Sequence, residues 1–295
     1  MTEGEKNFPE GRTTMIPDRV LEMIKQENSL PEEERADETE KEQARLLRER
    51  EGGLELHEQA ALADFRKKKS RYFSQEALRH KDLMRILREK GQILGQENRD
   101  WWAVTRRSLV VTLVATELAK ALNERADAGI DENMVEFAAL LHDLTKRFEY
   151  SQEAKQYEAE GKGDRYDFVD GVMDGIFAKP EVLAQLRKFV ADPAKIKTLA
   201  QATGMQVAKR GCNLQTMEEK IIYLADKYVK HSALVSLAER RQDVARRYTH
   251  DKVAEEYEYA GKIEEEFAAM LGIEVSQMPD FLQSVIIARI EGQEI

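Results

Sequence analysis

An adjacent histidine and aspartate, His142 and Asp143, end an apolar run that begins at Phe137. An imidazole nitrogen and a carboxylate oxygen side by side can bind one divalent ion, whereas a helix that only packs rarely places an ionisable aspartate among leucines. Lys146 follows the pair by about one helical turn, where it could stabilise a developing oxyanion or simply interact with the helix end. The pair therefore predicts part of a metal site, with Lys146 as a candidate catalytic cation.

A third carboxylate, Asp226, falls on the apolar face of a later predicted helix. It comes four residues after Ile222 and three before Val229, so it points toward the core. A carboxylate is too costly to bury alone, so a metal ion or a basic side chain should lie opposite it. Together, His142, Asp143 and Asp226 offer one nitrogen and two oxygen donors, a set suited to Mn²⁺, Fe²⁺, Zn²⁺ or Mg²⁺.

The two segments that carry these residues resemble ligand blocks of the HD superfamily, helical metal-dependent phosphohydrolases named for their His-Asp pair. The matching stretches are Ala-Leu-Leu-His142-Asp143-Leu-Thr-Lys146 and Glu219-Lys-Ile-Ile-Tyr-Leu-Ala-Asp226-Lys, and the similarity spans roughly residues 101–237. The resemblance implies an HD-domain-like helical bundle with a divalent metal bound by His142, Asp143 and Asp226. It also implies hydrolysis of a nucleotide or other small phosphate ester, with the ion activating water for attack on phosphorus.

The first metal ligand of the family pattern is replaced in this chain. The family has a histidine followed by a small residue on its opening core helix, and the matching segment here reads Arg106-Arg107-Ser108. Arg107 precedes Val111 by four residues and Val114 by seven, so it shares their buried stripe. A guanidinium remains protonated and has no lone pair for a metal ion. The predicted metal site is therefore weakened or lost.

Three interpretations of Arg107 remain open. In the first, the guanidinium replaces the ion and pairs with Asp226 or Asp143, which leaves a non-catalytic regulatory or scaffolding module. In the second, the three remaining ligands hold an ion weakly and Arg107 binds a substrate phosphate, so that the protein is an unusual hydrolase. In the third, a histidine from elsewhere completes the site, and His80 is the upstream candidate.

The apolar spacing predicts an all-α chain. Six prolines, 16 glycines and few alternating β-branched stretches leave little material for a sheet. Asp131 is expected to cap the helix that carries His142, and Thr216 with Glu219 has the spacing of a capping box for the helix that carries Asp226. A long core helix after Asp100 is predicted from the stripe Val104, Val111, Val114, Leu118 and Leu122.

Charge patterning divides the chain into three parts. Residues 1–73 are predicted to be a charged arm and linker, disordered or loosely helical, through which a protein partner could bind. Residues 74–250 form the HD-like domain, and residues 251–295 add amphipathic helices that pack on it or extend it. The basic residues Arg66 to Arg71 in the arm, and Arg240 with Arg241 further on, are interpreted as solvated charge.

The overall composition narrows the function classes. The 295 residues are 42% hydrophobic and include 46 basic and 56 acidic side chains, which gives a net charge of −10. This balance makes nucleic acid and anionic membranes unlikely partners and favours small or local ones. A small phosphate-containing ligand is what the resemblance to the HD superfamily implies. One cysteine excludes an intramolecular disulfide, and the sequence has no apolar run long enough to cross a membrane. A cytoplasmic protein is expected.

Overall fold

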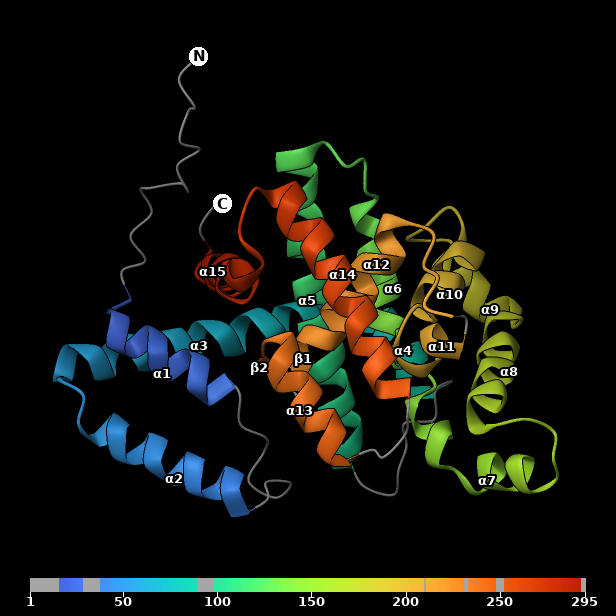
Figure 1. Cartoon of the computed structure of the whole chain (residues 1–295), viewed down its shortest axis with the longest axis horizontal. Helices are drawn as coiled ribbons and strands as arrows, with labels where there is room; N and C mark the ends of the chain where they lie inside the picture. The colour runs from blue at the N-terminus through green and yellow to red at the C-terminus, as the bar shows by residue number, and fades with distance from the viewer. Residues whose placement is uncertain are drawn as a thin grey trace.

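The prediction of an all-α fold is confirmed. The computed structural model describes residues 16–28, 38–89, 98–209, 211–230, 233–247 and 252–292. In these ranges the chain is mostly helical, and one short antiparallel ladder pairs β1 (Val229–Lys230) with β2 (Ala233–Leu234). Figure 1 shows the helices gathered around α5, with α1 and α2 at one end and α7 to α9 at the other.

The helices fall into consecutive groups along the chain. The first group is α1 (Asp18–Asn28), α2 (Glu38–Gly52), α3 (Leu56–Arg79) and α4 (Lys81–Glu89). The central pair is α5 (Asn98–Ala126) and α6 (Glu132–Leu141). The next group is η2 (Lys146–Tyr150), α7 (Gln152–Ala159), α8 (Arg165–Phe177), α9 (Pro180–Leu186), α10 (Pro193–Ala200) and α11 (Gly204–Lys209). The last group is α12 (Met217–Tyr228), α13 (Leu237–Arg247), α14 (Lys252–Leu271), η3 (Val275–Gln277) and α15 (Met278–Ile290).

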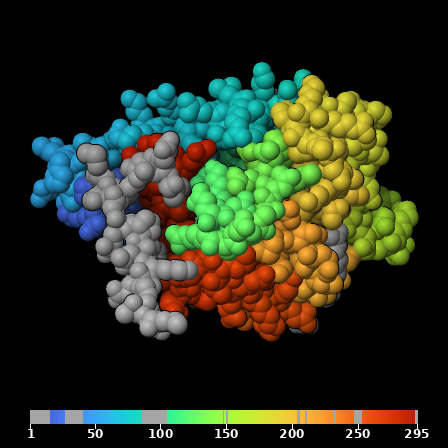
Figure 2. All heavy atoms as spheres, turned by 90° about the horizontal axis from the view of Figure 1, so that it is seen from above, coloured from blue at the N-terminus to red at the C-terminus, as the bar shows by residue number. Residues whose placement is uncertain are grey.

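Helix α5 is the centre of the core. Val111, Val114, Leu118 and Leu122 on its predicted stripe have no exposed surface, and α6, α12, α14 and α15 all pack against it. Figure 2 views the molecule from above, with the light-green turn between α5 and α6 in the middle of this face. The cyan α3 region runs along one side of that turn and the red α14 region along the other. The burial of α5 on several sides fixes the position of any side chain on its stripe, including Arg107.

Local capping sets where the two other core helices begin. The Asp131 side chain accepts a hydrogen bond of 3.0 Å from the backbone N–H of Met134, as predicted for the start of α6. The predicted capping box is also present at α12. There the Thr216 hydroxyl accepts from the Glu219 N–H at 3.2 Å, and the Glu219 carboxylate accepts from the Thr216 N–H at 3.0 Å.

The described part of the N-terminal arm is helical. Val20 and Ile24 lie one turn apart on α1 and are buried, as is Phe65 on α3. Residues 1–15 and 29–37 of the arm lie outside the described residues. The boundary expected after residue 73 falls inside α3, which continues to Arg79. The charged segment and the domain are therefore joined by one helix, which buries Glu58 together with Leu62 and Phe65.

The first and last described helices meet. Lys25 on α1 forms an ion pair of 3.0 Å with Asp280 on α15, and Lys68 on α3 forms one of 2.7 Å with Glu291, just after α15. The C-terminal helices thus pack on α5 and also contact the arm.

No helix in the described ranges combines the length and the apolar character needed to cross a membrane.

Candidate functional site

Three core helices bring the predicted site residues together. His142 is the C-terminal capping residue of α6 and Asp143 follows it, while Asp226 lies in the last turn of α12. Arg107 comes from the buried stripe of α5. The four side chains are largely enclosed, since only 18% of the Arg107 side chain and 13% of the Asp226 side chain are exposed. The residues chosen from the sequence therefore form one buried polar cluster.

The guanidinium of Arg107 bridges the two aspartates. Its Nε atom lies 3.3 Å from Oδ2 of Asp143, and its Nη2 atom forms a close ion pair with Oδ1 of Asp226. Its Nη1 atom donates a hydrogen bond of 2.8 Å to the carbonyl oxygen of Val229, where β1 begins. One planar group thus contacts both carboxylates and a backbone oxygen, a use of the guanidinium fork that a lysine ammonium could not reproduce.

His142 supplies a second positive charge. Its Nδ1 atom lies 2.6 Å from the carbonyl oxygen of Ala139, which can only accept, so Nδ1 carries a hydrogen. Its Nε2 atom lies 3.3 Å from Asp143 and 3.5 Å from Asp226, in ion-pair contacts that lack good hydrogen-bond geometry. Burial alone would lower the pKa of His142, but the two carboxylates outweigh burial and raise it to about 10. The ring is therefore an imidazolium at neutral pH.

The pKa values of the two aspartates are shifted in the opposite direction. Burial by itself would raise the pKa of Asp143, but His142, Arg107 and Lys146 together hold it well below its ordinary value. Burial would also raise the pKa of Asp226, but Arg107 and His142 outweigh burial, so this pKa is lowered as well. Two carboxylates thus face a guanidinium and an imidazolium, so the charges of the cluster balance within the protein.

This arrangement does not fit the divalent ion that the resemblance implies. A metal ion would need the carboxylate oxygens of Asp143 and Asp226 and a neutral Nε2 on His142. The Arg107 guanidinium contacts both of those carboxylates, and its own contact with Val229 holds it there. An ion could enter only if a largely buried cation moved away from two anions. Arg107 therefore balances the charge of the two aspartates that a bound ion would otherwise have balanced.

Lys146 lies close to the cluster and contacts a different partner. It is the first residue of η2, and its Nζ atom forms an ion pair of 3.1 Å with Glu149. Its side chain is 44% exposed, although its charge contributes to the lowered pKa of Asp143. The lysine is thus near enough to act electrostatically on the aspartate.

His80, the alternative ligand, belongs to a separate group of side chains. Its Nε2 atom lies 3.0 Å from Glu136 and 3.5 Å from Glu76, and its ring packs edge-on against Phe137. Within the described part of the chain, the ion pairs of His80 are with Glu76 and Glu136 and not with Asp143 or Asp226. The histidine therefore does not complete the His142 cluster.

The sequence did not identify Arg240 as a largely buried charged residue. Only 17% of its side chain is exposed, and it forms an ion pair of 2.7 Å with Asp243. Burial lowers the pKa of Arg240, and the nearby charge of Arg107 lowers it further. The interpretation of Arg240 as solvated charge is therefore wrong, whereas Arg241 is exposed. An aspartate three residues after the arginine was the available signal, because residues at this spacing share a helix face.

Comparisons of the chain with family models, curated proteins and solved structures find no match.

Proposed function

We propose that this protein is a non-catalytic, HD-like helical module in which Arg107 takes the place of a metal ion. The observation that carries the proposal is the guanidinium bridging Asp143 and Asp226. Because Arg107 engages both carboxylates, they are not free to hold a metal ion that would lower the pKa of a bound water, which is the step that metal-dependent phosphate hydrolysis requires. The module would then have a regulatory or scaffolding role.

The alternative is a weak phosphohydrolase that uses Arg107 to hold a substrate phosphate. For this role the guanidinium would have to turn its donors toward a ligand, yet its donors already contact Asp143, Asp226 and the Val229 carbonyl. Breaking these contacts would leave two buried carboxylates without their main counter-charge. The structural role of Arg107 is therefore favoured over the substrate-binding role.

Metal titration of two matched variants tests the proposal. Arg107→His adds a fourth donor, whereas Arg107→Gln removes the cation without adding a nitrogen ligand. Arg107→His should bind one Mn²⁺ or Zn²⁺ ion more than the wild type, and should bind it more tightly than Arg107→Gln does. Adding Asp226→Asn should abolish that extra ion, which assigns it to the cluster. Elemental analysis and calorimetry on untagged protein provide the measurement.

The wild type must also be assayed directly. It should not hydrolyse nucleoside triphosphates, nucleoside monophosphates or p-nitrophenyl phosphate in the presence of Mn²⁺, Mg²⁺ or Zn²⁺. Metal-dependent turnover by the wild type that disappears in Asp226→Asn, while the variant keeps its folded structure, would contradict the non-catalytic proposal and favour the hydrolase.

A scaffolding role would use the N-terminal helices as the contact surface. Helix α2 packs on α1. Its C-terminal end is bound to α3, because Arg66 donates two hydrogen bonds of 2.8 and 3.0 Å to Glu51. Crosslinking in cells should connect a partner to lysines of this region, such as Lys41 and Lys67. Partner crosslinks found only at the opposite end, for example at Lys195 on α10, would contradict this assignment.

A further inference from the structure

A second group of ionisable side chains lies where α3 ends against α6. Glu76 and His80 are four residues apart, so both side chains leave the same face at the end of α3, and Glu136 approaches from α6. Each of the three offers one potential ligand atom, and these atoms all lie within 4.8 Å of one another. His80 and Glu136 are buried, and Glu76 is half-buried.

The histidine nitrogen points into this group without a hydrogen bond. The His80 side chain is only 3% exposed, and its Nε2 atom has no hydrogen-bond partner, although Glu136 is 3.0 Å away and Glu76 is 3.5 Å away. Both carboxylate oxygens therefore lie off the direction in which an Nε2 proton would point. Donors around a tetrahedral zinc ion have a similar relationship, because bonds of about 2.0–2.2 Å place neighbouring ligand atoms about 3.3–3.6 Å apart. The His80–Glu76 separation of 3.5 Å falls in this range, and the His80–Glu136 separation of 3.0 Å is slightly shorter.

The positive charge now facing these carboxylates is easy to displace. Arg79 contacts Glu76 at 3.2 Å and Glu136 at 2.8 Å, but 52% of its side chain is exposed. It can therefore turn into solvent when another cation arrives, at a cost no greater than that of a surface ion pair. Arg107, by contrast, is enclosed and held by a backbone carbonyl, so it is harder to displace than Arg79.

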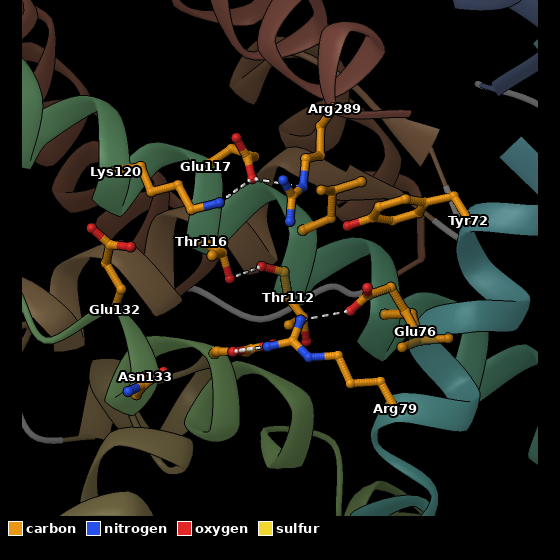
Figure 3. A pocket seen from close by; sticks show the side chains of 13 residues that line it. Tyr72, Glu76, Arg79, Thr112, Thr116, Glu117, Lys120, Glu132, Asn133 and Arg289 are labelled. Carbon is orange, nitrogen blue, oxygen red and sulfur yellow. Dashed lines mark hydrogen bonds and ion pairs between the residues drawn. The ribbon is translucent and has the colours of Figure 1, made fainter. Parts of the chain in front are cut away.

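A cavity adjoins the two carboxylates. It has a volume of about 170 Å³, and Glu76, Arg79 and Glu136 are part of its wall. Figure 3 shows Arg79 directed toward Glu76 at one side of the cavity, with Lys120 and Arg289 directed toward Glu117 at the other. Lys120 lies 2.9 Å from Glu117, and Arg289 lies 3.7 Å from the same carboxylate. Lys120 and Arg289 thus both contact Glu117, whereas Arg79 is shared between Glu76 and Glu136.

We propose that Glu76, His80 and Glu136 bind a divalent transition-metal ion, with Zn²⁺ as the best-fitting ion, at the wall of this cavity. One imidazole and two carboxylates suit Zn²⁺ better than Ca²⁺, which prefers six to eight oxygen ligands. His80 would hold the ion from the buried side, and the two glutamates would hold it from the cavity side. The remaining coordination position would face the cavity, where water or an anionic oxygen could occupy it.

Zinc titration of the full, untagged chain tests this site. Calorimetry with ZnCl₂ should show one equivalent bound by the wild type, and Co²⁺ substitution should give the intense visible absorption of a four-coordinate ion. Glu136→Gln keeps the shape of the side chain and should weaken Zn²⁺ binding by at least about 100-fold, as should His80→Gln, because loss of a ligand exceeds the 10–100-fold effect of outer-shell changes. Arg79→Gln should tighten binding by up to about fivefold, since it removes an exposed competing cation.

Two control variants and one further ligand variant make the result specific. His57→Gln removes an exposed histidine that contacts Glu55 at 3.3 Å, and it should leave Zn²⁺ affinity unchanged. Asp226→Asn should also leave it unchanged, because the ion is assigned outside the His142 cluster. Glu76→Gln changes a half-buried carboxylate, so it supplies a ligand variant even if His80→Gln fails to fold. Absence of zinc binding by the wild type, or binding that survives both Glu136→Gln and Glu76→Gln, would overturn the proposal.

Discussion

Arg107 on α5 and Val229, the residue that follows α12, are joined by a hydrogen bond of 2.8 Å from the guanidinium to the carbonyl oxygen. Through this contact, the guanidinium that bridges Asp143 and Asp226 also binds the backbone. It also connects the core helix to the start of the β1–β2 ladder. The arginine is therefore part of the packing of α5, α6 and α12 as well as of their charge balance.

Removal of Arg107 should strongly destabilise the protein. Arg107→Ala removes the cation that bridges two largely buried carboxylates, and loss of one partner from a buried ion pair typically costs about 3–5 kcal/mol. Urea unfolding followed by circular dichroism measures the change. Arg85→Ala, an exposed change on α4, is the control and should stay within about 0.5 kcal/mol of the wild type. A loss at Arg107 no larger than the loss at Arg85 would show that the bridge is not needed for stability.

The free energy of unfolding should fall in alkaline solution. The pKa of His142 is about 10 in the folded protein against an ordinary value of 6.5, so the folded state holds the proton more tightly. The stabilisation is fully present below pH 6.5 and is lost as the pH rises toward 10. Denaturant titrations at several pH values measure the slope. His142→Gln should flatten it, and an equal slope in this variant would assign the alkaline loss to other groups.

The loss of stability at acid pH should depend on Asp143 and Asp226. Because the pKa values of Asp143 and Asp226 are lowered on folding, their contribution is present above the ordinary aspartate value of 3.8 and is lost as the pH falls through their folded values. Asp226→Asn should reduce the slope of stability against pH below 3.8 in the same titrations. A variant as acid-sensitive as the wild type would count against this origin.

Lys146 should contribute little to stability. Its side chain is 44% exposed and its ion pair with Glu149 lies near the surface, so Lys146→Met should cost less than about 1 kcal/mol. Burial raises the pKa of Glu149 and Lys146 lowers it, so the variant should raise the Glu149 pKa further. Carbon-detected NMR titration of the glutamate side chains measures that shift. A Glu149 pKa unmoved by the substitution would mean that the two charges do not interact in solution.

Tyr223 should matter for the attachment of the C-terminal helices. Its ring is fully buried on α12, and its hydroxyl donates a hydrogen bond of 2.7 Å to the carbonyl oxygen of Glu256 on α14. Tyr223→Phe leaves that carbonyl without its donor and should cost about 1–2 kcal/mol. Tyr157→Phe is a matched control, because the variant retains the ring contact with Phe168. Thermal unfolding of both variants should separate them, and equal melting temperatures would contradict the role given to the hydroxyl.

Local signals in the sequence predicted the helices around the cluster. The capping residues Asp131 and Thr216 begin α6 and α12, because a cap depends on side chains within three residues of the helix start. The stripe on α5 placed Arg107 in the interior for the same reason, since helical periodicity is a local property. The side-chain types and their burial were therefore readable before the tertiary structure.

The contacts that these side chains make could not be predicted from local sequence signals. Arg107 contacts both aspartates, whereas spacing along the chain could not choose between Asp143 and Asp226. Glu136 meets His80 from a helix far along the chain, and no periodicity links residues on separate helices. The burial of Val20 and Phe65 in the arm could not be predicted for a related reason, because it depends on packing against other helices.

The ion pair between Lys25 and Asp280 has a consequence for how this protein is made. The two residues are 255 positions apart, so α1 leaves the ribosome long before its partner on α15 has been synthesised. Contacts of such long range form late, because closing a long loop costs chain entropy before the contact stabilises it. During translation the buried face of α1, with Val20 and Ile24, must wait for at least one of its neighbours. Helices α2 and α3, which pack on α1, follow it directly in the chain and can cover this face early, whereas the ion pair to α15 can form only after nearly the whole described chain has been made.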